Sequence, residues 1–167
     1  MKGNENLWLH ASGVGYSGRR KHQKKRIRMD AINPTPEQLQ KVLADTPKNQ
    51  PVVMLNLLRF RERANYTEDA PERSGREAYT LYMEEAAACV KSVGAEVIWS
   101  GRSVGSLIAP PDESWDQVLL VRYPSIDAFM AMIESPEYKG VVKHRTAALK
   151  DSRLVANVEG ENRAGSA

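Results

Sequence analysis

Hydrophobic residues recur along the chain with two periods, one typical of helices and one typical of strands. Thr35, the proline after it and Gln38 predict the start of a short helix, which Pro47 ends. Residues 51–60, PVVMLNLLRF, form an almost continuous apolar run with Asn56 as its one polar interruption. A run of this length and composition predicts a buried central strand.

A second helix is predicted after the polar loop at 61–74. Ser74 and Glu77 form a capping box at its start, and Gly94 supplies a left-handed stop. One face of this helix is apolar, because hydrophobic positions recur three and four residues apart: Ala78, Leu81, Tyr82, Ala86, Cys89, Val90 and Val93. Cys89 therefore faces inward, where a thiol without a neighbouring base is expected to be inert packing.

A hairpin is predicted next. Residues 95–109 alternate imperfectly and contain Gly101 and Gly105, which predicts a long strand that bends or bulges. A turn at 110–113 leads to another strand at 115–123. The short connection makes this pair antiparallel.

Two helical segments and a strand complete the pattern. Ser125 caps the first segment, and Ser135 caps a second one that runs to about residue 149. A last short strand is expected at 152–160, followed by a frayed tail at 161–167.

From residue 51 the expected order is strand, helix, strand, strand, helix, strand. Two such halves with right-handed crossovers place four strands in one antiparallel sheet with the helices on one face. We therefore expect an α+β, ferredoxin-like βαββαβ domain at 50–160, preceded by a short leading helix and linker at 34–49. The strands are apolar on both faces, so the bare face needs a partner. We expect a homodimer in which two sheets close into an α+β barrel.

Length and composition narrow the class of protein. A chain of 167 residues allows one domain and a short appendage. Its longest apolar runs fall short of the roughly 18 residues that a transmembrane helix needs, so no membrane partner is expected. The single cysteine excludes an internal disulfide and a cysteine-based zinc site. We expect a cytoplasmic protein.

The net charge of +3 comes from the amino terminus alone. Residues 1–28 carry a dense cluster of Lys and Arg with one acid, whereas the rest of the chain is mildly acidic. With several glycines and no period, residues 1–33 are expected to form a disordered basic extension. Two interpretations stay open: an inert extension, or an arm that binds nucleic acid or another anionic partner. The cluster lacks interleaved aromatic residues, which argues against nucleic acid.

The chain also resembles the domain of unknown function 1330 family, within the dimeric α+β barrel superfamily. The resemblance rests on the strand at 51–60, the hairpin VIWSGRSVGSLI with WDQVLLVRYPS, SPEY at 135–138 and HRTAALKDSRL at 144–154. It covers about residues 50–158 and leaves the leading helix outside. It implies the fold and the dimer. Superfamily relatives include small monooxygenases, isomerases and haem enzymes, which implies a ligand cavity between helices and sheet or inside the barrel, but the family has no established reaction.

Motifs for cofactors are missing from the sequence. No phosphate-binding glycine loop, metal-ligand pair or nucleophile elbow is present, so no cofactor and no metal is expected. His144 is the one histidine of the expected domain and the candidate catalytic residue, as an acid or base at a pocket rim. The alternatives are a half-buried surface histidine and, formally, a haem ligand. Glu84 and Glu85 are expected to be solvated.

Arg145 falls near the centre of the apolar stripe of its helix. A guanidinium there needs an anion or must extend to solvent. Two interpretations stay open: an internal salt bridge to an acid such as Asp151 or Glu134, or an anchor for the carboxylate or phosphate of a ligand.

Polar and aromatic side chains within the strands complete the candidate ligand-binding set. Asn56, Arg102 and Arg122 belong to different strands, and such side chains can converge on one cavity. Trp99 can line the same cavity, or it can belong to the core or a dimer interface. With Arg145, these four residues are the expected ligand contacts.

Three functions follow from these features. The first is an enzyme or binder that takes a small polar or anionic metabolite into a pocket of the barrel. The second is a non-catalytic dimeric module, and the third is binding of an anionic partner through the basic arm. The sequence leaves open whether a reaction takes place.

Overall fold

The computed structural model describes residues 31–67 and 70–160. The expectations for the basic extension up to residue 30 and for the tail at 161–167 lie outside these residues. The first described residues already make ordered contacts, because the N–H of Ala31 donates to Asp151 (2.9 Å) and its carbonyl accepts from the N–H of Ser152 (2.7 Å). Structure therefore begins before residue 34, the predicted boundary.

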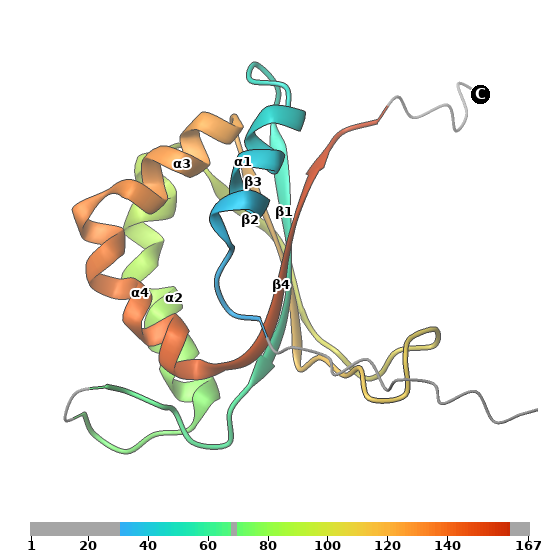
Figure 1. The fold of residues 1–167 in the computed structure, drawn as a ribbon. Helices are drawn as coiled ribbons and strands as arrows, with labels where there is room; N and C mark the ends of the chain where they lie inside the picture. Colours follow the sequence, from blue (N-terminus) through green and yellow to red (C-terminus); the bar gives the residue numbers. More distant parts are fainter. Residues whose placement is uncertain (1–30, 68–69, 161–167) are drawn as a thin grey trace, which may run out of the picture.

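Four strands form one sheet in the order β2-β3-β1-β4, and every neighbouring pair is antiparallel. The strands are β1 (Val52–Phe60), β2 (Glu96–Arg102), β3 (Gln117–Tyr123) and β4 (Leu149–Val158). Helices α2 (Gly75–Ser92), α3 (Ile126–Glu134) and α4 (Pro136–Ala148) lie together on one face of the sheet (Figure 1). This confirms the predicted α+β, ferredoxin-like fold.

The leading helix α1 (Pro36–Asp45) lies on the same side of the sheet as the other helices (Figure 1). Its predicted capping box is present, since Thr35 accepts from the N–H of Gln38 and Gln38 accepts from the N–H of Thr35. No residue of α1 is fully buried, although Val42 and Leu43 pack partly against the core. The helix is thus docked by one apolar stripe.

The core lies between the sheet and the helices in two clusters. The larger cluster joins the inward side chains of β1 and β3 to α2 and α3: Val52, Met54, Leu119, Val121, Tyr123, Cys89, Ile126 and Met132. The smaller one joins the end of β1 to α2 and the α4–β4 junction: Leu58, Ala78, Tyr79, Ala148 and Leu149. Cys89 is a free, buried thiol, as its position on the apolar helix face predicts.

The opposite face of the sheet is covered by none of the described helices (Figure 1). The pairing register places these apolar side chains on it: Val53, Leu55, Leu57, Trp99, Val118, Leu120 and Val155. In the single chain they are half-buried or exposed, and Trp99 exposes 53% of its surface. We call this surface the outer sheet face.

The strand predicted at 95–109 is too long. β2 ends at Arg102, and residues 103–109 have no strand partner. The apolar side chains that suggested the longer strand, Val104, Leu107 and Ile108, point into solvent. The predicted bulge exists, but the register shifts between Val97 and Trp99 and not at the glycines.

The last strand begins earlier than predicted. Leu149 caps α4 with an extended backbone (φ −92°, ψ 132°) and is also the first residue of β4, so no loop separates the two elements. The polar residues Lys150 to Ser152, which indicated a connection, are the first residues of the strand.

Candidate functional site

A cavity of about 630 Å³ lies between the inner face of the sheet and the helices. Its floor comes from β1, β3 and β4, its walls come from α2, α3 and α4, and the segment from Ala31 to Val42 lines its remaining side. Its volume falls within the roughly 300–1,000 Å³ of small-molecule sites. It is therefore the candidate binding site of this chain.

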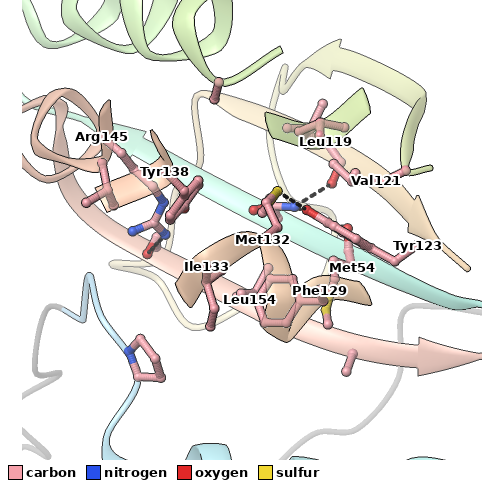
Figure 2. A pocket seen from close by; sticks show the side chains of 18 of the residues that line it. Met54, Leu119, Val121, Tyr123, Phe129, Met132, Ile133, Tyr138, Arg145 and Leu154 are labelled. Carbon is pink, nitrogen blue, oxygen red and sulfur yellow. Dashed lines mark hydrogen bonds between the residues drawn. The ribbon is translucent and has the colours of Figure 1, made fainter. Parts of the chain in front are cut away.

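One end of the cavity is apolar. Figure 2 shows Met54, Phe129 and Tyr123 grouped there, with Met132 and Val121 beside them. Tyr123 adds no exposed polar group, because its hydroxyl points to the sulfur of Met132 (3.8 Å). This end can accept an aliphatic or aromatic group without leaving a polar atom unpaired.

The other end is polar. Arg145 and Tyr138 lie side by side there (Figure 2), and Tyr82 lies behind them with its hydroxyl 3.0 Å from that of Tyr138. Hydrogen-bonding groups from α2 and α4 therefore meet at this end. Asn56 belongs to the floor of the cavity, where its amide nitrogen donates to the carbonyls of Met54 (3.1 Å) and Leu119 (3.4 Å).

Arg145 contacts two neutral groups of its own chain. Its guanidinium donates to the carbonyl of Ile32 (2.8 Å) and to the hydroxyl of Ser152 (3.3 Å). Among the described residues it has no acidic partner, and Asp151 pairs with Arg153 instead. The expected salt bridge to Asp151 or Glu134 is absent there because the helix turn that carries Arg145 faces the leading segment. Three of its five N–H groups are not used in these bonds.

Tyr79, Tyr82 and Tyr123 stay neutral over the physiological range, because the pKa of each is raised. Burial raises the pKa of Tyr79 to about 12, against a lowering influence of the Arg145 guanidinium. Burial, with the nearby Tyr138, raises the pKa of Tyr82 still further above its usual value, and burial also raises the pKa of Tyr123. Neutral phenols donate hydrogen bonds and do not repel an anion.

The leading segment is attached to the polar end of the cavity. Ala31 and Ile32 are held by Asp151, Ser152 and Arg145 through the bonds described above, and the Ser152 hydroxyl also donates to the carbonyl of Ala31 (3.1 Å). Leu39 and Val42 of α1 line the cavity beyond this attachment. The segment therefore covers one side of the cavity.

His144 does not line the cavity. Its Nδ1 lies 2.7 Å from the hydroxyl of Tyr66 and its Nε2 lies 3.3 Å from a carboxylate oxygen of Glu85. A neutral ring with its proton on Nε2 satisfies both partners, since it accepts from the phenol and donates to the carboxylate. The ring thus ties the loop after β1 to α2 and α4. Sequence spacing gave no sign of this cluster, because the packing of two helices creates it.

Three other candidate residues lie away from the cavity. Trp99 is on the outer sheet face, paired with Leu120. Arg122 lies on the same face, with its guanidinium 3.4 Å from Glu96 and 3.7 Å from Glu159. Arg102 is exposed at the end of β2. The predicted convergence on one cavity is therefore limited to Asn56 and Arg145.

The polar groups that accompany Arg145 are absent from the predicted ligand contacts. Tyr82 lies on the apolar stripe of its helix, which predicts packing, and Tyr79 and Tyr138 carry no sequence motif for ligand binding. Their hydroxyl groups are the usable signal, since a phenol buried among apolar residues needs a hydrogen-bond partner. The leading segment gave no such signal.

The described residues hold no group of three or more His, Cys, Asp or Glu side chains that could bind a metal ion. Within the same ranges, none of the helices has the length and apolar character needed to cross a bilayer.

The chain is similar to a protein family and to two solved structures of one protein. The profile of a family described as a domain of unknown function (DUF1330) matches residues 72–160. Two crystal structures of RPA0582, a protein of unknown function from Rhodopseudomonas palustris, have TM-scores of 0.74 and 0.73 at 40% and 39% identity. Each match covers 80% of this chain and at least 98% of that one. Residues 50–167 make up less than 80% of the chain. The match to RPA0582 therefore also includes part of the leading segment, which lies outside the resemblance described above.

More distant structures share the topology alone. Hydroxynitrile lyase from Passiflora edulis matches with a TM-score of 0.48 at 10% identity, covering 68% of this chain and 96% of its own. A protein of unknown function from Bacteroides fragilis, described as dimeric and of ferredoxin-like fold, matches with a TM-score of 0.44 at 15% identity, covering 68% and 100%. No match was found among curated proteins. By its profile match and its likeness to RPA0582, the chain belongs to the DUF1330 family.

Proposed function

We propose that this protein binds a small carboxylic acid with an aliphatic or aromatic part in the cavity between its sheet and helices. The observation that carries the proposal is the one-sided polarity of the cavity. Arg145 and Tyr138 lie at one end, and Met54, Phe129 and Met132 line the other (Figure 2). A molecule with one anionic group and one apolar group matches both ends.

The polar end suits a carboxylate in particular. Arg145 supplies the charge and has N–H groups left after its bonds to Ile32 and Ser152. In the bonded pair of Tyr82 and Tyr138, one hydroxyl donates to the other, so the second keeps a proton to donate to the ligand. Hydrogen bonds between ionised and neutral groups in a buried site are stronger than neutral ones.

The volume limits the size of the ligand. If each non-hydrogen group takes about the 30 Å³ of a water molecule in the liquid, the cavity holds up to roughly 20 of them. Medium-chain fatty acids and aromatic acids fall within this limit. The proposal takes no proton transfer from His144, because its ring lies outside the cavity.

Calorimetric titration with octanoate and with octanamide tests the proposal. Octanamide has nearly the same shape without the charge, so octanoate should bind more tightly. Arg145→Met should weaken octanoate binding by about 10-fold or more, the loss of a charged hydrogen bond. Arg102→Met is the matched control, since it removes an arginine that does not line the cavity. Equal affinity for both ligands, or an unchanged affinity of Arg145→Met, would contradict the proposal.

The outer sheet face supports a second part of the proposal, that two copies pair into a barrel. An apolar surface made by four strands is larger than a monomer usually leaves in water. Trp99 lies on this face with its ring over Gly101, where an added Cβ would lie 2.5 Å from a ring atom. Large aromatic residues of this kind are enriched at protein interfaces.

A further inference from the structure

The loop between β2 and β3 carries the most exposed apolar side chains that the structure describes. Val104, Leu107 and Ile108 expose 88%, 104% and 98% of their surfaces. Single exposed hydrophobic residues are common, but three large aliphatic side chains within five residues form an apolar tip in water. Such a tip marks a contact that the described part of the chain does not make.

The base of this loop is fixed, so its direction is set by the fold. The N–H of Ser103 donates to the carbonyl of Asp116 (3.1 Å), and Asp116 bonds to the backbone of Leu58 (2.8 Å) and Phe60 (2.7 Å) at the end of β1. Trp115 is buried beside it, with the guanidinium of Arg153 5.2 Å from its ring. From this base the loop projects to the side of the sheet that faces away from the helices (Figure 1).

We propose that residues 104–108 form an arm that packs on a second copy of this chain. The inference rests on the pairing of two copies proposed above and adds a contact outside the sheet. The arm and the outer sheet face lie on the same side of the molecule, and the strand positions Trp99 and Gly101 lead directly into the arm. A second copy seated on the sheet therefore lies within the path of the arm.

The number of residues in a stable interface also supports a second copy of this chain as the partner of the arm. Such an interface takes about 20 to 30 residues from each side. The outward positions of the four strands provide only about a dozen: Val53, Leu55, Leu57, Arg59, Trp99, Gly101, Val118, Leu120, Arg122, Arg153, Val155 and Asn157. The loop residues 103–111 bring the number to about 20. The arm completes what the sheet face alone does not supply.

The arm is held at both of its ends. Before it, the N–H of Ser103 donates to the carbonyl of Asp116 (3.1 Å); after it, Pro110 and Pro111 restrict the backbone, and the N–H of Glu113 donates to the carbonyl of Pro110 (2.9 Å). A segment held at both ends loses less conformational entropy when it docks than a free one does. In a symmetric pair each copy contributes one arm, so every contact occurs twice.

Sedimentation analysis of the full chain tests the arm. The variant Val104→Ser/Leu107→Ser/Ile108→Ser should raise the dimer dissociation constant by about 1,000-fold or more, because each of the three buried aliphatic side chains accounts for roughly a tenfold change. Its thermal unfolding, measured at a concentration where it is monomeric, should match that of monomeric wild type, since the tip packs on none of the residues that the structure describes. The matched control Val104→Ile/Leu107→Met/Ile108→Leu keeps the apolar character and should leave the dissociation constant within about threefold.

A photo-crosslinker at position 107 gives direct evidence. In a mixture of isotopically light and heavy protein, crosslinked peptides that combine both labels show contact between copies, and the arm predicts them on the outer sheet face. A dimer whose dissociation constant the serine variant leaves unchanged would overturn the arm alone. A wild-type chain that stays monomeric would overturn both the arm and the pairing, and ligand binding in the cavity would be judged separately by calorimetry.

Discussion

Gly75, the first residue of α2, is the place where a single methyl group should disturb the fold most. A Cβ at this position would lie 2.5 Å from the carbonyl oxygen of Ala148, 2.8 Å from the amide nitrogen of Arg61 and still closer to the carbonyl oxygen of Arg61. All three are backbone atoms, and two hydrogen bonds link them: Arg61 donates to Ala148 (2.9 Å) and Gly75 donates to Arg61 (3.1 Å). No side-chain rotation can relieve these contacts.

The cost follows from that geometry. Overpacking of a tight site costs about 1 to 3 kcal/mol, and here at least one backbone hydrogen bond of about 1 kcal/mol must also lengthen. We therefore expect Gly75→Ala to lower the free energy of unfolding by about 2 to 4 kcal/mol. Gly140 provides the matched control, because nothing lies within 4 Å of its added Cβ and it occupies the interior of α4. Gly140→Ala should stabilise the protein by about 0.5 to 1 kcal/mol.

Urea denaturation of the two variants and of the wild type measures both effects. The two substitutions add the same atoms, so the difference in sign depends only on what surrounds each position. A loss below about 0.5 kcal/mol for Gly75→Ala would refute the close approach of Gly75 to Arg61 and Ala148, because overpacking typically costs about 1 to 3 kcal/mol.

Three further outcomes follow. Burial raises the pKa of Tyr79 to about 12, whereas the unfolded chain loses this proton near pH 10. The free energy of unfolding, measured by urea denaturation, should therefore be constant up to about pH 10 and fall above it. In Tyr79→Phe the fall should be less steep, by up to about 1.4 kcal/mol per pH unit. Leu55→Glu should give a monomer in sedimentation analysis, since a carboxylate in the centre of an apolar interface is costly to bury. Ile133→Trp should fill part of the cavity and lower octanoate affinity by about 10-fold or more in calorimetry, with the secondary structure unchanged by circular dichroism.

The fold could be predicted because each element carries its own signal. The capping residues Thr35, Ser74, Ser125 and Ser135 all accept hydrogen bonds at the helix starts that the sequence predicts. These signals are local and depend on no distant residue. The apolar runs of β1 and β3 likewise predict buried strands, whichever strands pair with them.

The site could be predicted only in part, because its geometry depends on contacts between distant segments. Strict alternation puts Trp99 on the same face as Val97, which lines the cavity, but the bulge between them turns Trp99 to the outer sheet face. His144 meets Glu85 and Tyr66 only after two helices and a loop have packed. The apolar stripe predicts that Arg145 faces inward, but its partners are a backbone carbonyl and a hydroxyl, which no pattern of charged side chains predicts.

The central claim, that the cavity takes a carboxylic acid with an apolar part, is tested most directly by spectra of the methionine methyl groups. Met54, Met83 and Met132 line the cavity, whereas Met130 does not, so one labelled amino acid supplies both probes and control. Titration of full-length protein with octanoate should shift the first three signals and leave that of Met130 in place, and Arg145→Met should need about 10-fold more octanoate or more for the same shifts. Uniform small shifts of all four signals, or none at saturating octanoate, would contradict the claim.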